Sequence, residues 1–462
     1  MSCPAECVAV PAIEFAGANG AVAENTEAFS ADTTRGGIYL AIRYGLGVLV
    51  SVGNMLVMTW WIGPHAYGLF VTAIGIVSFL ASLARGGIDT YLVRSEVPPD
   101  SCMYGTATTL IGLMSLGLTL GGAALTPLLV RWYGNREFVA SYLALLLTIP
   151  VTALTALPMA KLERALSFRS IAGIELAGQV AGLLVAAALA WSRAGVWAPV
   201  AGQITWQAVT LIASAISASL ALRLKFNRCQ ARQMLSYGAG LTASMRTWQL
   251  RGLVNPLLVG RFAGAEAVAF VGLAIRIAEA LGTFRLAAGR IAIAALARLQ
   301  ARREDFRKGV EHALYLQVII LAPLLCGFAL LGPSLLPHVV GARWMPSLTV
   351  YPFIAMGVLV NSVYNLQASA LFVIGKQWVV MRSYAAHVAI LVAVTLLLLP
   401  RLGIAGYGWA ELLACVAYFV IHAGLASEVE ISYRKLLPWV STSAACLFLV
   451  PIAHWFARMA VH

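Results

Sequence analysis

Apolar residues recur along the chain in runs of about 20, separated by short polar segments. The runs are continuous and lack the strict alternation of a lipid-facing β-strand, which argues against a membrane barrel. They predict an all-α polytopic membrane protein. The thirteen expected spans are 37–60, 69–88, 107–130, 138–158, 170–191, 196–222, 235–259, 267–289, 312–331, 347–373, 377–400, 404–426 and 438–457.

Composition supports this assignment. Of 462 residues, 60% are hydrophobic and only 11% are charged, which is too little charge to cover the surface of soluble domains. The seven cysteines lie scattered, and their spacing indicates neither a zinc site nor a disulfide framework. The sequence holds no phosphate-binding loop, HExxH or GxSxG motif, and its loops are short. We therefore expect no cofactor, no metal and no catalytic residue.

The basic residues fix the expected orientation. Alternate loops hold eighteen Lys and Arg, whereas the opposite set holds seven, and basic loops remain in the cytoplasm. This bias places the N-terminus inside, with residues 1–35 as a cytoplasmic tail that has no signal peptide. The net charge of +13 is mostly a topology signal and requires no nucleic-acid partner. Residues 295–312 are expected to form a basic amphipathic helix on the inner membrane surface.

The first and second sets of six spans resemble each other. Residues Gly63 to Ile74 align without gaps to Gly264 to Ile275, and Arg193 to Val196 align to Arg401 to Ile404, with offsets of 201 and 208 residues. Six spans per copy give both copies one orientation, related by a pseudo-two-fold axis along the membrane normal. The expected domains are the tail at 1–35, six-helix lobes at 36–234 and 235–427, and an additional C-terminal helix at 428–462.

Several arginines lie where a charge is hardest to solvate. An arginine at mid-membrane costs about 2.5 to 3.5 kcal/mol on insertion scales, and the few acids nearby do not balance these cations. We interpret the surplus as a cationic cavity for a phosphate or pyrophosphate, which guanidinium groups bind bidentately. The predicted pyrophosphate ligands are Arg43, Arg246, Arg251 and Arg276. The alternative is that these arginines pair with backbone carbonyls or extend to the interfaces.

Other polar side chains within the spans are candidates for lining the same cavity. The predicted sugar-binding residues are Asn54, Gln249, Asn361 and Asn365, and the ion-coupling candidates are Asp89 and Glu279. The pairs Glu175 with Gln179 and Gln203 with Gln207 also have i, i+4 spacing. Such residues also serve as hydrogen-bonding links between helices, which is the competing interpretation. Ion pairs are expected between Arg276 and Glu279 and between Arg85 and Asp89.

Three segments resemble a known family. Arg43 to Arg94, with WWIGPHAYGLF and ASLARGGIDTYLVRSE, is similar to the opening of the polysaccharide-type (Wzx or PST) flippases of the multidrug/oligosaccharidyl-lipid/polysaccharide (MOP) superfamily. Leu162 to Glu175 and Arg193 to Gln203 resemble the fourth-to-sixth-span region of that family. The resemblance covers about residues 36–426. It implies alternating access and an undecaprenyl-pyrophosphate-linked oligosaccharide as substrate, in a bacterial inner membrane.

The function hypothesis is therefore a lipid-linked oligosaccharide flippase for exopolysaccharide or lipopolysaccharide O-antigen synthesis, coupled to H⁺ or Na⁺. The partners expected of it are the membrane, the glycan polymerase and the export machinery. A drug or cation antiporter of the same superfamily is the first alternative, and it should show deep acids outnumbering deep arginines. A membrane glycan polymerase or ligase is the second, but the longest expected outer loop, 332–346, is short.

Overall fold

The computed structural model describes residues 47, 50, 53–95, 97–283, 303–429 and 431–459, with the backbone alone at 237–244, 303 and 450–459. Its regular elements are all helical over these ranges. Residues 53–61 are helical. The α-helices that follow are α2 (Pro64–Arg85), α3 (Ile88–Arg94), α4 (Ser101–Ala124), α5 (Thr126–Tyr133), α6 (Val139–Leu146), α7 (Thr148–Arg164), α8 (Phe168–Trp191), α9 (Trp197–Ser217), α10 (Arg228–Leu250), α11 (Gly260–Phe262), α12 (Gly264–Leu281), α14 (Arg303–Leu336), α15 (Ser347–Val373), α16 (Gln377–Leu402), α17 (Ile404–Ala414), α18 (Phe419–Ala426) and α19 (Leu437–Met459).

Tighter and wider turns interrupt some of the expected spans. The span expected at 235–259 is α10 followed by a 3₁₀ turn η1 (Arg251–Leu253) and a π turn η2 (Asn255–Val259). The break has a local cause, because Pro256 has no N–H to donate within a helix. The span expected at 404–426 is divided between α17 and α18 by a 3₁₀ turn η5 (Cys415–Tyr418). Two further turns, η3 (Pro337–Gly341) and η4 (Ala342–Trp344), follow α14.

The protein is an all-helical, polytopic membrane protein. Nine segments in the described ranges are long and apolar enough to cross a membrane, among them α4, α8, α15 and α16. The separate surface helix expected at 295–312 is not supported where the structure describes it. Residues 303–312 are the first turns of α14, which continues without interruption into its apolar part.

The chain divides into two compact units. Unit 1 comprises Met1–Val57, Leu80–Pro127 and Ala140–Thr242, and unit 2 comprises Met58–Phe79, Leu128–Val139 and Ala243–His462. The predicted domain boundaries at 35, 234 and 427 remain predictions.

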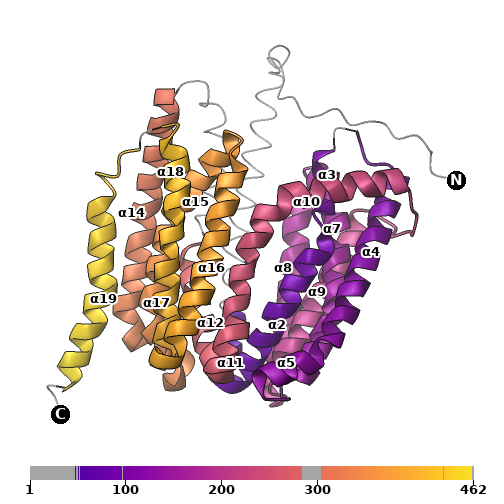
Figure 1. Cartoon of the computed structure of the whole chain (residues 1–462). Coiled ribbons are helices and arrows are strands. Elements are labelled where there is room, and N and C mark those ends of the chain that lie inside the picture. Colours follow the sequence, from indigo (N-terminus) through magenta and orange to yellow (C-terminus); the bar gives the residue numbers. More distant parts are fainter. Residues whose placement is uncertain are drawn as a thin grey trace. The chain divides into compact units, whose positions relative to one another are not determined.

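Unit 1 is a helical bundle in which α7 packs against α4 and α9, and α8 packs along α9 (Figure 1). Glycines allow the last pair to approach closely. A Cβ atom at Gly182 would lie 2.7 Å from the carbonyl oxygen of Gly202, and one at Gly178 would lie 2.3 Å from Oγ1 of Thr210. Small residues at such crossings are typical of helix packing in membranes.

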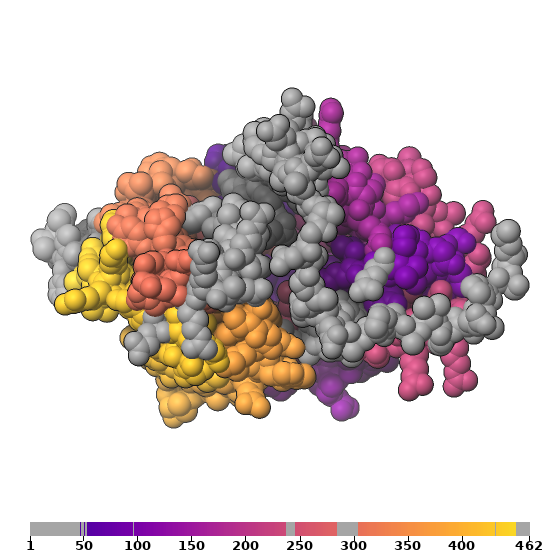
Figure 2. Space-filling view, turned by 90° about the horizontal axis from the view of Figure 1, so that it is seen from above, coloured from indigo at the N-terminus to yellow at the C-terminus, as the bar shows by residue number. Residues whose placement is uncertain are grey.

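Unit 2 is a second bundle, in which α14, α15, α17 and α19 are neighbours (Figure 1). The segment after α18 is tied to the start of α14, because the backbone N–H of Ser432 donates to Glu311 Oε1 at 2.9 Å. Figure 2 shows this yellow segment beside the salmon first turns of α14.

The turns aligned in the sequence have glycines with matching φ angles. Gly63 and Gly264 both have φ of 84°, and Gly195 and Gly403 both have φ of 58°. This left-handed region is one that residues with a Cβ rarely adopt. The cysteines, in contrast, differ from the expectation, because Cys102 on α4 and Cys229 on α10 are disulfide-bonded.

Candidate functional site

Unit 1 contains a polar cavity of about 440 Å³ within its helical bundle. Its lining residues are Arg85, Asp89, Thr152, Thr155, Ala156, Met159, Ala160, Glu163, Glu175, Gln179, Trp206, Gln207 and Thr210. The volume lies in the range of about 300 to 1,000 Å³ that is usual for small-molecule sites. A cavity with this lining is able to hold a hydrated or hydroxyl-rich ligand among helices that cross a membrane.

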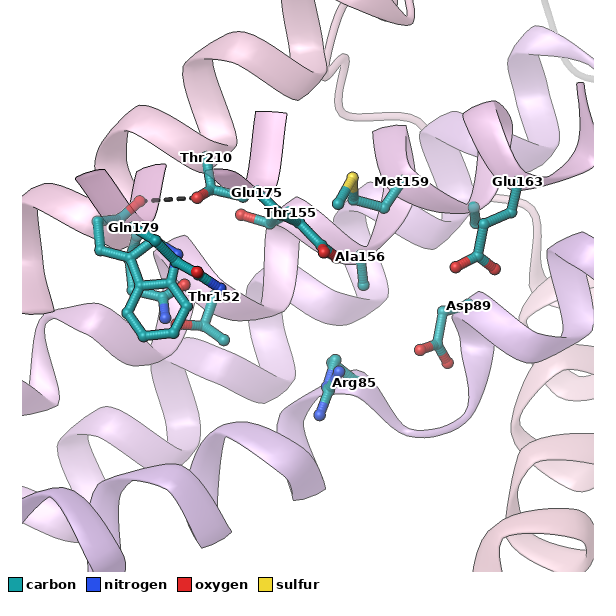
Figure 3. A pocket seen from close by; sticks show the side chains of 13 residues that line it. Arg85, Asp89, Thr152, Thr155, Ala156, Met159, Glu163, Glu175, Gln179 and Thr210 are labelled. Atoms are coloured by element: carbon teal, nitrogen blue, oxygen red, sulfur yellow. Dashed lines mark hydrogen bonds between the residues drawn. The ribbon is translucent and has the colours of Figure 1, made fainter. Parts of the chain in front are cut away.

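Helical spacing explains why these side chains converge. Thr152, Thr155, Met159 and Glu163 follow one another at three or four residues along α7, so they form one stripe. The same spacing places Glu175 above Gln179 on α8 and Trp206 above Thr210 on α9. Figure 3 shows Gln179 and Thr152 near one end of the cavity, and Asp89 and Glu163 near the other.

A glycine turn brings the remaining two charged residues to the cavity. Gly86 and Gly87 have φ of 63° and 76°, so α2 ends at Arg85 and α3 begins at Ile88. Because the helix is broken, the expected i, i+4 ion pair between Arg85 and Asp89 does not form. Oδ1 of Asp89 instead accepts the N–H of Thr90 at 2.9 Å, at the start of α3.

A guanidinium group outside the lining holds α3 in place. Nη1 of Arg164, the last residue of α7, donates to the carbonyl oxygens of Leu92, Val93 and Ser95 at 3.2, 3.4 and 2.6 Å. These carbonyls are at the C-terminal end of α3, where the helix has no N–H partners of its own. Arg164 therefore fixes the short helix that carries Asp89.

Unit 2 contains a buried ion pair between Arg251 and Glu411. Nη2 of Arg251 donates to Oε1 of Glu411, and the exposed fractions of the two side chains are 21% and 2%. Each partner lies next to a helix break, Arg251 in η1 and Glu411 one turn before η5. Irregular backbone at membrane depth is tolerated where it is buried in protein or lines a cavity.

Aromatic rings surround this pair. The guanidinium carbon of Arg251 lies 5.0 Å from the ring centroid of Trp248, a cation–π distance. The ring of Trp248 is 5.3 Å from that of His387, and His387 stacks on Tyr418 at 5.0 Å. His387 is fully buried, and its Nδ1 lies 3.0 Å from the carbonyl oxygen of Ala414.

The predicted pyrophosphate ligands have different environments. Arg251 has an acid partner, Glu411, which the sequence pattern did not predict. Arg246 is half-buried near the end of α10, and Arg276 is exposed on α12. Arg43 lies outside the described residues.

The other predicted site residues are also dispersed. Asn361 Nδ2 donates to the hydroxyl of Tyr418 at 3.0 Å, which joins it to the aromatic group around Arg251. The carbonyl of Asn365 accepts the Ser369 hydroxyl at 3.0 Å. Asn54 is half-buried and Gln249 is exposed.

The two ion-coupling candidates differ in their surroundings. Asp89 lines the cavity of unit 1, whereas Glu279 is exposed on α12. Arg276 and Glu279 do not form the expected i, i+3 ion pair. Within the described parts of the chain, no three His, Cys, Asp or Glu side chains are grouped closely enough to hold a metal ion.

Relatives of the chain are found by a family model of its sequence and by comparison with solved structures. The sequence model of the family described as "Polysaccharide biosynthesis protein" matches residues 57–349. Comparison with curated protein sequences finds no significant match.

Several solved structures share the fold. The lipid II flippase MurJ in an inward closed conformation has a TM-score of 0.75 at 13% identity, over 91% of this chain and 93% of that chain. An inward-facing multidrug resistance MATE family transporter of the MOP superfamily has a TM-score of 0.62 at 14% identity, over 82% of this chain and 94% of that chain. The MATE multidrug transporter DinF-BH has a TM-score of 0.58 at 14% identity, over 87% of this chain and 96% of that chain. These are transporter folds and not enzyme families, and the chain belongs to the polysaccharide biosynthesis protein family.

Proposed function

We propose that the chain is a flippase. It moves an undecaprenyl-pyrophosphate-linked oligosaccharide repeat unit from the cytoplasmic to the outer leaflet of a bacterial plasma membrane, for exopolysaccharide or O-antigen synthesis. Membership of the polysaccharide biosynthesis family and a fold shared with a lipid II flippase support this proposal. The membrane-spanning helices supply the path across the bilayer.

The cavity of unit 1 is the observation that carries the proposal. It brings an aromatic ring, Trp206, together with the amides of Gln179 and Gln207 and three threonine hydroxyls. Amides and hydroxyls can exchange hydrogen bonds with sugar hydroxyls, and an aromatic ring covers the apolar face of a pyranose. Oε1 of Gln179 is buried and has no hydrogen-bond partner among the described residues, so it can accept a ligand donor. We assign this cavity to the glycan.

The pyrophosphate is assigned to arginines. Arg251, Arg246 and Arg276 are the described candidates, and Arg43 is the fourth. In this proposal the chain forms two six-helix lobes, followed by the thirteenth helix. The lobes are related by a pseudo-two-fold axis along the membrane normal, and they would alternate access to the substrate. The equal φ angles of Gly63 with Gly264 and of Gly195 with Gly403 support the internal repeat.

The N-terminus is assigned to the cytoplasm on the basis of the basic loops. Glu163 then lies at the inner end of α7, and we assign the opening of the unit 1 cavity to the cytoplasmic side. Coupling to H⁺ or Na⁺ is assigned first to Asp89, because it lines this cavity, and second to Glu279.

Surface glycan in a deletion strain tests the function. The strain should lose surface polysaccharide and accumulate lipid-linked repeat units on the cytoplasmic face, and the wild-type gene should restore export. Gln179→Leu combined with Gln207→Leu should reduce export at equal protein level, as should Arg246→Ala combined with Arg276→Ala. Gln203→Leu is the matched control, because Gln203 is on the same helix as Gln207 but does not line the cavity. Normal surface glycan in the deletion strain would exclude the flippase.

A drug or cation antiporter is the second candidate, and one observation favours it. The cavity lining contains three carboxylates, Asp89, Glu163 and Glu175, and one guanidinium, Arg85. Acids outnumber arginines there, as an antiporter of cations requires. Efflux of a cationic dye distinguishes the candidates. An antiporter would lower dye accumulation in cells and leave their surface glycan unchanged, whereas a flippase would have the opposite effects.

A further inference from the structure

The ion pair of unit 2 poses a problem for the pyrophosphate assignment. Arg251 is one of the guanidinium groups assigned to the substrate, yet in the structure it is bound to Glu411. A guanidinium group that holds a carboxylate through Nη2 cannot present the same face to a diphosphate. A diphosphate that binds this Nη2 edge of Arg251 must therefore displace Glu411.

Displacement would leave Glu411 in an environment that cannot support its charge. Its side chain is 2% exposed, and its second oxygen, Oε2, is buried with no hydrogen-bond partner among the described residues. On the α15 side it faces Gly357, where an added Cβ would stand 3.5 Å from Cγ of Glu411. An isolated buried carboxylate becomes neutral by binding a proton rather than remaining ionised.

Arg251 is the cation that contacts Glu411 in the structure. Several titratable and charged groups interact with the pair or with its aromatic neighbours. They include Tyr384 and His387 from α16, Tyr364 from α15, Tyr407 from α17, Cys415 and Tyr418 from η5, and Glu279 from α12. His387 is not a fixed cation. It is fully buried, its Nδ1 can only donate to the carbonyl of Ala414, and its Nε2 has no described partner, which is the pattern of a neutral imidazole.

We propose that the diphosphate of the lipid-linked substrate takes Arg251 from Glu411, and that Glu411 binds a proton from the aqueous phase in the same event. The guanidinium group keeps its charge and exchanges one anion for another, and one proton enters the protein for each diphosphate bound. Release of the diphosphate returns Arg251 to Glu411 and expels the proton. Glu411 thus balances the charge of the site during diphosphate binding, a role separate from the ion coupling assigned to Asp89 or Glu279. This inference rests on the proposed function, because it requires a diphosphate substrate.

The structure provides the freedom that the exchange needs. The 3₁₀ turn that carries Arg251 is followed by the π turn Asn255–Val259, and the 3₁₀ turn Cys415–Tyr418 follows Glu411. Helix breaks of this kind in membranes occur at binding sites, where backbone hydrogen bonds are already irregular. The Trp248 ring, 5.0 Å from the guanidinium carbon, can retain its cation–π contact while the anion changes.

The test measures diphosphate affinity against pH. The full-length protein in lipid nanodiscs is titrated with farnesyl diphosphate by calorimetry between about pH 7.5 and 9, above the pH at which phosphate groups titrate. If one proton is taken up for each diphosphate bound, the affinity of the wild-type protein for farnesyl diphosphate should increase about tenfold for each unit by which the pH is lowered. Repeating the titration in two buffers of different ionisation enthalpy counts the protons directly and should give about one per diphosphate.

Variants locate the proton. Glu411→Gln should bind farnesyl diphosphate at pH 9 more tightly than wild type and with no pH dependence. Arg251→Ala should lose binding at every pH. Glu137→Gln, which changes an acid exposed in a loop of unit 2, should retain the wild-type pH dependence.

The overturning results are equally distinct. A Glu411→Gln protein that keeps the wild-type pH dependence would place the proton elsewhere. If this variant does not fold, the proton count on wild type decides, and a count near zero overturns the inference, as does the absence of farnesyl diphosphate binding. Loss of surface polysaccharide in the deletion strain would still support the flippase in each case, so the two failures are distinguishable.

Discussion

Gly63 and Gly264 have the same backbone φ, 84°, in turns that lie 201 residues apart. Gly63 directly precedes α2, and Gly264 is the first residue of α12, in the two segments that align without gaps. A left-handed residue at the same position of both turns is a structural property that two short sequence matches alone do not provide. It favours descent of the two segments from one duplicated unit.

The shared conformation predicts a cost for adding a side chain. At Gly264 an added Cβ would meet no atom within 4 Å. Gly264→Ala therefore measures the cost of the left-handed backbone conformation alone, without a steric clash. The left-handed conformation costs an L-residue about 1 to 2 kcal/mol, and the thermal midpoint in detergent should fall accordingly. Gly117→Ala, in the middle of α4 and also without neighbours, should not lower it, because alanine favours a helix. Equal midpoints for both variants would argue against the strained turn.

A second glycine is required for close packing. A Cβ atom at Gly68 would lie 1.8 Å from the carbonyl oxygen of Ala265, which is an impossible contact. Gly68→Ala should therefore separate α2 from the start of α12 and destabilise unit 2 more than Gly264→Ala does. Thermal unfolding of the two variants side by side measures the difference. A Gly68→Ala protein as stable as wild type would mean that this contact is not maintained in the bilayer.

Arg343 ties η4 to the helix at residues 53–61. Its Nη2 donates to the carbonyl oxygens of Thr59 and Trp60, and Nε1 of Trp344 donates to the same Thr59 oxygen at 3.1 Å. A lysine keeps the charge but not the planar fork, and charge-assisted hydrogen bonds contribute about 1.5 to 3 kcal/mol. Arg343→Lys should lower the thermal midpoint, while Arg136→Lys, at an exposed position, should leave it unchanged.

The exposed pair His65 and Glu137 predicts a weak pH dependence. Nε2 of His65 lies 2.8 Å from Oε2 of Glu137, and this hydrogen bond, followed by that from Asn135, lowers the pKa of Glu137. A carboxyl whose pKa is lowered in the folded state stabilises above its unfolded pKa and loses that contribution as the pH falls through the folded one. Solvent screens such a pair, so Glu137→Gln should match the thermal midpoint of wild type at acidic pH and differ little at neutral pH. A large difference at neutral pH would contradict this.

Much of the fold was predictable because each membrane helix is encoded by its own apolar run. The spans expected at 170–191 and 347–373 correspond to Phe168–Trp191 and Ser347–Val373. The break after Leu250 was missed, although Pro256 was a visible signal, because the apolar pattern continues past it. The cavity of unit 1 was predicted only in part. Glu175, Gln179 and Gln207 were recognised as members of polar pairs, but helical spacing does not distinguish residues that line a cavity from residues that link helices.

The pairing of Arg251 with Glu411 could not be predicted from spacing. The two residues are 160 positions apart, and periodicity describes only the face of a single helix. Their opposite charges in apolar surroundings were the available signal, because each alone would be costly to bury. Only the packing of unit 2 determines which of the deep charges meet.

Arg164 gives the cavity of unit 1 a dependence on a residue outside its lining. The seven-residue helix α3 is too short to persist alone in water, and one guanidinium group satisfies three carbonyls at its end. A substitution at Arg164 would let α3 fray and would move Asp89 without altering any side chain that contacts the ligand. In related chains, a substitution at the position of Arg164 should therefore change substrate preference from outside the cavity, because it changes how firmly α3 is held.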